Sequence, residues 1–149
     1  MSRAAIDDFV KQKRLAVVGV SHTGQRFGAI AYKTLKKQGY ELTPVHPTAE
    51  TILGDKAARS LTALPAPVDG VVIIVPPAKS AAVVRDAAEA GIKRIWLQQG
   101  AESDEAIELA QGRGLSVVHH QCLLMFASNT GFPHSAHRFV LKLFGKLPR

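Results

Sequence analysis

Short apolar runs and amphipathic segments alternate along this chain. The apolar runs are rich in Val and Ile and show no regular alternation of polar and apolar positions, which is typical of strands covered on both faces. These runs lie at residues 15–20, 41–45, 69–75, 94–97 and 115–118, with a weaker candidate at 56–58. Between them, apolar positions recur at helical spacing over 27–38, over 80–90 and in a segment that Ser103 would cap.

Strands that alternate with helices and are apolar throughout predict an α/β fold with a doubly wound parallel sheet in three α/β/α layers. With the weaker candidate included, we expect six strands in the order 3-2-1-4-5-6. A length of 149 residues and a hydrophobic fraction of 46% suit one domain that spans residues 1–149.

The net charge of +7 is concentrated toward the end of the chain. Every acidic residue lies at or before Glu108, and a basic extension follows from about residue 126, with an amphipathic helix expected over 135–144. Such an extension could meet nucleic acid, an acidic membrane surface or a phosphate-rich small ligand, or could be a solvated face. Clustered aromatic residues, on which single-stranded nucleic acid stacks, are nearly absent, so nucleic acid is the weaker interpretation.

The cysteine content and the absence of long apolar runs indicate the cell compartment. Cys122 is a single cysteine, so an intrachain disulfide is excluded and a reducing compartment is favoured. Residues 1–11 contain Asp7 and Asp8 and no apolar run, unlike a secretory signal, and no run is long enough to span a bilayer. We therefore expect a cytoplasmic protein with no membrane partner.

The turn after the first strand is a candidate phosphate-binding loop. Ligands of doubly wound sheets bind at the carboxyl ends of the strands, where the strand order reverses. Gly19, Gly24 and Gly28 would allow a tight turn and bring the next helix, with its free N–H groups, close to a phosphate. Ser21 stands where the G-x-G-x-x-G motif has its second glycine, so this loop is not that motif. The glycines could also serve packing alone.

A histidine follows the second strand, where NAD-binding domains normally place an acid. His46 cannot accept two ribose hydroxyl protons as a carboxylate does, but an imidazolium can pair with a phosphate on the ribose. The substitution argues against NAD and favours coenzyme A or NADP. The alternative is that His46 only caps a turn.

Two later loops offer apolar and amide surfaces. Pro76 and Pro77 would form a rigid apolar shelf for an adenine or a pantetheine arm. The segment 98–100, Gln-Gln-Gly, could contact an amide-rich linear group, whereas Trp96 is expected in the core.

Several short motifs occur in a fixed order. They are Gly19-x-Ser21, Pro-Val-His-Pro at 44–47, Leu53-Gly54, Val-Pro-Pro at 75–77, Trp-Leu-Gln-Gln-Gly at 96–100, and Val117-Val118 followed by Cys122. Over roughly residues 10–125 this set resembles the stand-alone coenzyme A-binding proteins, which are similar to the N-terminal domain of the succinyl-CoA synthetase α subunit. The family usually has Asn where this chain has His46, and Asp-Arg where it has His120 and Gln121.

The resemblance implies a Rossmann-like domain whose loops after the first, second and fourth strands hold the adenine nucleotide part of coenzyme A. It assigns ligand contact to Gly19, Ser21, His22, Gly28, Pro44, His46, Val75, Pro76, Gln98 and Gly100.

The sequence offers only weak candidates for catalysis or metal binding. Cys122 with His119 and His120 could form a thiol nucleophile, but a single cysteine beside a strand is more often a core residue. Because His119 and His120 are adjacent, their side chains should point apart on a strand. His134 and His137 have a spacing that can hold a metal on a helix, without a further ligand nearby in the sequence. We therefore expect no enzyme and no metal.

Three functional hypotheses remain open. The first is a module that binds coenzyme A or an acyl-CoA at the carboxyl edge of the sheet, in a non-catalytic or accessory role, as a monomer or a homo-oligomer. The alternative is an NADP-dependent or acyl-CoA-handling enzyme completed by oligomerisation. The third is an interaction protein whose basic extension binds nucleic acid or another acidic partner.

Overall fold

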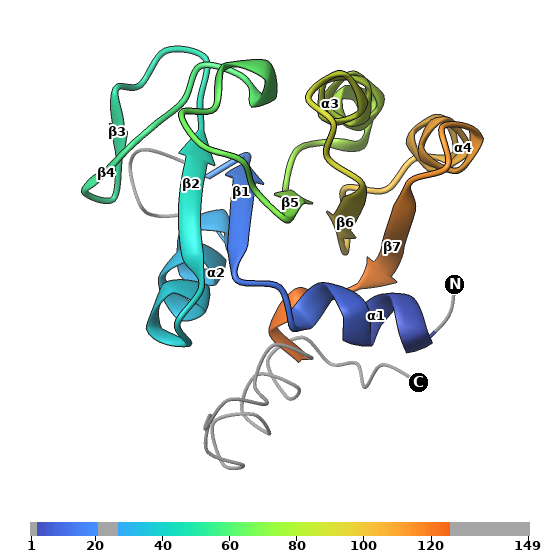
Figure 1. Cartoon of the computed structure of the whole chain (residues 1–149), viewed down its shortest axis with the longest axis horizontal. Coiled ribbons are helices and arrows are strands. Elements are labelled where there is room, and N and C mark those ends of the chain that lie inside the picture. Colours follow the sequence, from blue (N-terminus) through green and yellow to red (C-terminus); the bar gives the residue numbers. More distant parts are fainter. Residues whose placement is uncertain (1–2, 21–26, 126–149) are drawn as a thin grey trace.

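The computed structural model of this chain describes residues 3–20 and 27–125 (Figure 1). Its centre is a five-stranded parallel sheet in the order β2-β1-β5-β6-β7. The strands are β1 (Arg14–Val18), β2 (Glu41–Val45), β5 (Gly70–Ile73), β6 (Arg94–Gln98) and β7 (Ser116–Gln121). The predicted α/β class, with a doubly wound parallel sheet of Rossmann-like type, is confirmed.

Helices cover both faces of the sheet (Figure 1). One face carries α1 (Arg3–Val10), α2 (Phe27–Lys37) and the 3₁₀ turn η2 (Leu123–Met125), and the other carries α3 (Pro77–Glu89), α4 (Asp104–Gly112) and the 3₁₀ turn η1 (Leu61–Ala63). Strands enclosed in this way bury both rows of side chains, and Leu15, Ala16 and Val17 in β1 are 0% exposed. Double burial is the reason that the strand sequences show no polar alternation.

Helix α1 is not among the elements that we predict from the sequence. Its buried residues are Ile6, Phe9 and Val10, which stand at helical spacing. This short apolar pattern in the sequence could have predicted the helix. The Phe9 ring packs on Trp96 with centroids 5.3 Å apart, and Trp96 is 0% exposed, which confirms its predicted place in the core. Gly70, the first residue of β5, lies against this helix. A Cβ at this position would lie 2.8 Å from a ring carbon of Phe9, so a side chain here would clash with the ring.

The predicted sixth strand at 56–58 is wrong, since this segment joins the sheet through one isolated parallel bridge between Val45 and Ala58. The N–H of Ala58 donates to the Pro44 carbonyl oxygen at 2.9 Å, and the N–H of His46 donates to the Ala58 carbonyl oxygen at 2.8 Å. The adjacent hydrogen bond of a continued ladder would require an N–H from Pro44, which proline lacks. The strand order is therefore the predicted one without its first member.

Several element boundaries follow the sequence pattern. The Oγ of Ser103 accepts the N–H of Ala106 at 3.1 Å, which confirms the predicted cap of α4. Helix α3 begins at Pro77 rather than at residue 80, because proline suits the first position of a helix.

The helix expected over 135–144 and the basic extension from 126 lie outside the described residues. Among the described helices, none has the length and apolar character needed to cross a membrane.

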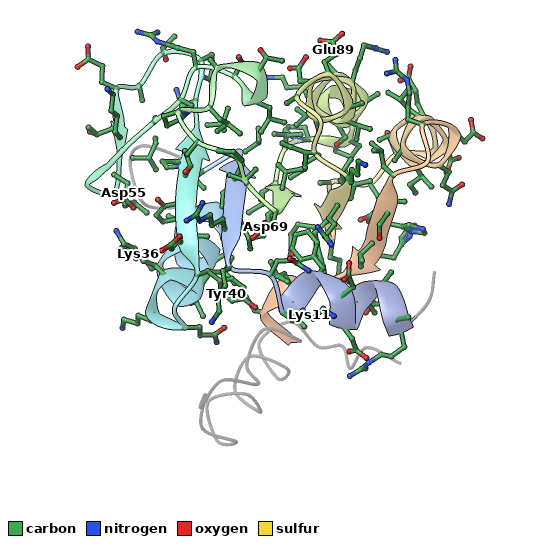
Figure 2. All side chains as sticks on the ribbon, viewed as in Figure 1. Lys11, Lys36, Tyr40, Asp55, Asp69 and Glu89 are labelled. Carbon is green, nitrogen blue, oxygen red and sulfur yellow. The ribbon has the colours of Figure 1, made fainter. Side chains whose placement is uncertain are left out.

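A polar cluster ties α2 to the hairpin formed by β3 (Thr51–Ile52) and β4 (Asp55–Lys56). The hydroxyl of Tyr32 donates to Oδ2 of Asp55 at 2.5 Å, and Nζ of Lys36 lies 2.8 and 2.7 Å from the two carboxylate oxygens. Figure 2 shows Lys36 and Asp55 side by side at this edge of the molecule.

Burial and charge shift two titrations in this cluster. Burial, reinforced by the hydrogen bond to Asp55 and by its charge, raises the pKa of Tyr32. Partial burial acts to raise the pKa of Asp55, but the hydrogen bonds from Lys36 and Tyr32 outweigh it and lower that pKa below its ordinary value. The folded state therefore favours a neutral phenol beside an ionised carboxylate.

We expect Asp55→Asn to lower the free energy of unfolding by about 1 to 2 kcal/mol near neutral pH, because a neutral amide replaces a charged acceptor. The pKa of Asp55 is lowered on folding, so this stabilisation is present above the ordinary aspartate value of about 4 and is lost as the pH falls through the folded-state pKa. Urea denaturation of the wild type and the variant at several pH values measures the effect.

Asp7→Asn is the matched control for this experiment. It breaks the ion pair between Asp7 and Arg3. The Arg3 side chain is 64% exposed and the Asp7 side chain 62%, so the loss should leave the stability almost unchanged. A stability difference between wild type and Asp55→Asn that stays constant from about pH 7 to about pH 3 would contradict the prediction.

Candidate functional site

A cleft of about 850 Å³ opens at the carboxyl ends of β1, β2 and β5. From β1 the sheet extends to β2 on one side and to β5 on the other, so the cleft lies where the strand order reverses. Its lining residues are Val18, Gly19, Val20, Gly28, Val45, His46, Pro47, Ile74, Val75, Pro76, Lys79, Val83, Gln99, Gly100 and Ala101.

The floor of the cleft requires a glycine at position 19. Gly19 has a φ of +109°, and a Cβ built on it would lie 2.0 Å from the carbonyl oxygen of Ile74. The N–H of Ile74 donates to the carbonyl oxygen of Val18 at 2.8 Å. The ends of β1 and β5 are thus held together so closely that any side chain at Gly19 would force them apart.

Gly28 brings the first turn of α2 onto the same floor. A Cβ at Gly28 would lie 3.2 Å from the carbonyl oxygen of Gly19 and 3.4 Å from Cα of Val20, which is tight but not prohibitive. The N-terminal turn of α2 therefore borders the cleft. There the helix dipole and the N–H groups that have no partner within the helix favour an anionic ligand.

His46 organises the loop that forms one wall. Its Nδ1 accepts the backbone N–H groups of Thr48 at 3.1 Å and Ala49 at 2.8 Å. The Nδ1 lone pair therefore serves as an acceptor for the loop backbone. This geometry is the turn cap that the sequence allows as the alternative role of His46, and pairing with a ribose phosphate stays a prediction. An asparagine side chain makes similar bonds in Asx turns.

The opposite wall is built from the start of α3. Val75 and Pro76 precede this helix, and Lys79 and Val83 line the cleft from successive turns of it. The wall is apolar except for the Lys79 ammonium group.

Hydrogen bonds fix the loop after β6 beside this wall. Ser80 is fully buried, and its hydroxyl donates to the carbonyl oxygen of Ala101. The carboxylate of Glu102 accepts the N–H of Gly100 at 3.0 Å. Because Gly100 and Ala101 both line the cleft, α3 and this loop form one side as a unit.

The structure brings most of the residues expected to contact a ligand together. Those that line the cleft are Gly19, Gly28, His46, Val75, Pro76 and Gly100. Ser21 and His22 lie outside the described residues. Lys79 and Val83 are lining residues that we do not predict, although their i, i+4 spacing directly after Pro-Pro was a usable signal.

Two of the expected residues lie away from the cleft lining. Pro44 faces the outer edge of β2, where its carbonyl oxygen accepts the N–H of Ala58. Gln98 is 3% exposed, and its Oε1 accepts the N–H of Leu123 at 3.0 Å. The Gln98 amide thus holds η2 against the sheet.

His119 and His120 do not point apart, contrary to our expectation for neighbours on a strand. His120 has a φ of +61°, which breaks the alternation of β7, and the Nδ1 atoms of the two rings lie 2.6 Å apart. Burial lowers the pKa of His119, and the charge of the neighbouring His120 adds a smaller effect in the same direction. Within residues 3–20 and 27–125, no three His, Cys, Asp or Glu side chains gather as a metal site.

Known proteins resemble this chain over most of its length. An uncharacterized protein from Bacillus subtilis, YneT, is 32% identical over 123 residues, which cover 82% of this chain and 91% of YneT. A solved hypothetical protein from Pyrococcus horikoshii has a TM-score of 0.81 at 28% identity, covering 87% of this chain and 92% of that one.

A longer enzyme subunit contains a similar region. The α subunit of acetate–CoA ligase (ADP-forming) II from Pyrococcus furiosus is 27% identical over 129 residues, which cover 79% of this chain and 28% of the subunit. This chain therefore corresponds to about a quarter of that relative. The family described as the CoA binding domain matches residues 13–128, and the chain belongs to this family.

Proposed function

We propose that this chain binds coenzyme A, free or acylated, in the cleft at the carboxyl ends of β1, β2 and β5, and that it does so without chemistry of its own. The observation that carries the proposal is the position of this cleft at the point of strand reversal in a chain of the CoA binding domain family.

The shape of the cleft supports a nucleotide-sized ligand. Its volume of about 850 Å³ falls in the range of small-molecule and cofactor sites. The first turn of α2 borders it through Gly28, where a diphosphate would meet helical N–H groups. Val45, Val75 and Pro76 give apolar surfaces suited to an adenine ring or a pantetheine arm.

The chemistry of the lining supports binding rather than catalysis. Among the described lining residues there is no thiol, hydroxyl or carboxylate side chain, and the groups that could transfer a proton are the side chains of His46 and Lys79. The ring of His46 accepts two loop N–H groups through Nδ1, an arrangement that stabilises the wall. We therefore propose an accessory role in which the chain holds the coenzyme.

Coenzyme A should raise the melting temperature of the purified protein, whereas NAD should not. Binding to the native state stabilises by about 2.7 kcal/mol when the ligand is at 100 times its dissociation constant. Thermal denaturation with coenzyme A, NADP and NAD at matched concentrations measures the selectivity, and mass spectrometry of ligand released on denaturation identifies what the protein carries. Equal shifts from NAD and coenzyme A, or a larger shift from NADP, would refute the proposed ligand.

The His46 loop provides a second prediction. His46→Asn should keep coenzyme A affinity within about twofold, because its Oδ1 can accept the same N–H groups. His46→Ala leaves those N–H groups without the acceptor, so we expect a loss of stability of about 1 kcal/mol and weaker binding. Urea denaturation and calorimetric titration of the three proteins measure both quantities. If His46→Asn binds as poorly as His46→Ala, the imidazole itself is a ligand contact.

A further inference from the structure

The cleft described above has one formal charge among its described lining residues, and Lys79 carries it. The aliphatic and proline side chains of the lining offer no charge, and Nδ1 of His46 is occupied by two backbone N–H groups of its own loop. Lys79 is exposed, and within the described part of the chain no carboxylate forms an ion pair with it. Its ammonium group is therefore available to a ligand that enters the cleft.

The backbone around Lys79 offers little else to an anion. Pro76 and Pro77 have no N–H, and the N–H of Lys79 donates to the carbonyl oxygen of Pro76 at 2.9 Å. The first turn of α3 thus differs from a helix start that presents several unpaired donors. Recognition of negative charge on this wall depends on the Lys79 side chain.

We infer that Lys79 binds a phosphate group of the ligand that occupies the cleft. The inference rests on the proposed function and assigns the phosphate-binding charge to the α3 wall rather than to His46. Lys79 and Val83 line the cleft one turn apart, so a ligand packed against Val83 would place a phosphate within reach of the flexible lysine. The phosphate is either the 3′-phosphate of the ribose or the diphosphate, and the experiment separates these two sources.

Calorimetric titration of the full chain with coenzyme A and with dephospho-coenzyme A tests the role of Lys79. Lys79→Gln should weaken coenzyme A binding about tenfold, and Lys79→Arg should keep most of the affinity. If the lysine contacts the 3′-phosphate, Lys79→Gln loses the preference for coenzyme A over its dephospho form. If it contacts the diphosphate, both ligands weaken equally. Added salt should weaken binding more in the wild type than in Lys79→Gln.

Lys93→Gln is the matched control, since it removes the same charge from an exposed lysine that directly precedes β6, at the amino ends of the strands and away from the cleft. This variant should bind coenzyme A like the wild type. Equal losses in Lys79→Gln and Lys93→Gln would overturn the inference, because they would indicate a general effect of net charge.

The remaining outcomes separate the inference from the proposed function. If the wild type binds coenzyme A and Lys79→Gln binds it within about twofold, the assignment of Lys79 is overturned while the proposed function stands. If the wild type binds no coenzyme A, the proposed function fails, and the inference fails with it.

Discussion

At the ends of β1 and β5 the backbone of Gly19 lies against the carbonyl group of Ile74, with no space for a side chain between them. This contact lets β1 end in a left-handed turn and allows α2 to start against it at Gly28. The two helices that follow these strands, α2 and α3, then cover opposite faces of the sheet. The cleft lies between their starts, so it follows from the close approach of two strands and from the strand order.

The main sheet was predictable because buried parallel strands have a strong pattern of their own, whereas the edge of the sheet depends on single hydrogen bonds. The uninterrupted apolar run at 69–75 indicates a central strand without reference to its neighbours. Segment 56–58 has a weaker pattern. Whether it pairs with β2 as a strand depends on an N–H that Pro44 lacks. Helix α1 was missed because its apolar pattern is short and draws its stability from packing on Trp96.

The candidate site was predictable in position but not in chemistry. Topology alone directs attention to residues after each strand, and Gly19, Pro76 and Gly100 accordingly line the cleft. The role of the His46 ring depends on which backbone groups it meets, and two N–H groups reach Nδ1 only after the loop has folded. Gln98 looks like a ligand contact in the sequence because an amide serves a ligand and a buried backbone N–H equally well.

The two walls of the cleft differ in how they are held, and this difference bears on selectivity. The α3 wall is braced by the bond from Ser80 to Ala101 and by Glu102 on Gly100, so its apolar surface is preorganised. The Lys79 side chain is a flexible charge on a rigid support. If the cleft holds a coenzyme as proposed, the fixed surfaces would orient the adenine or pantetheine, while the lysine could follow a phosphate through small differences in ligand pose.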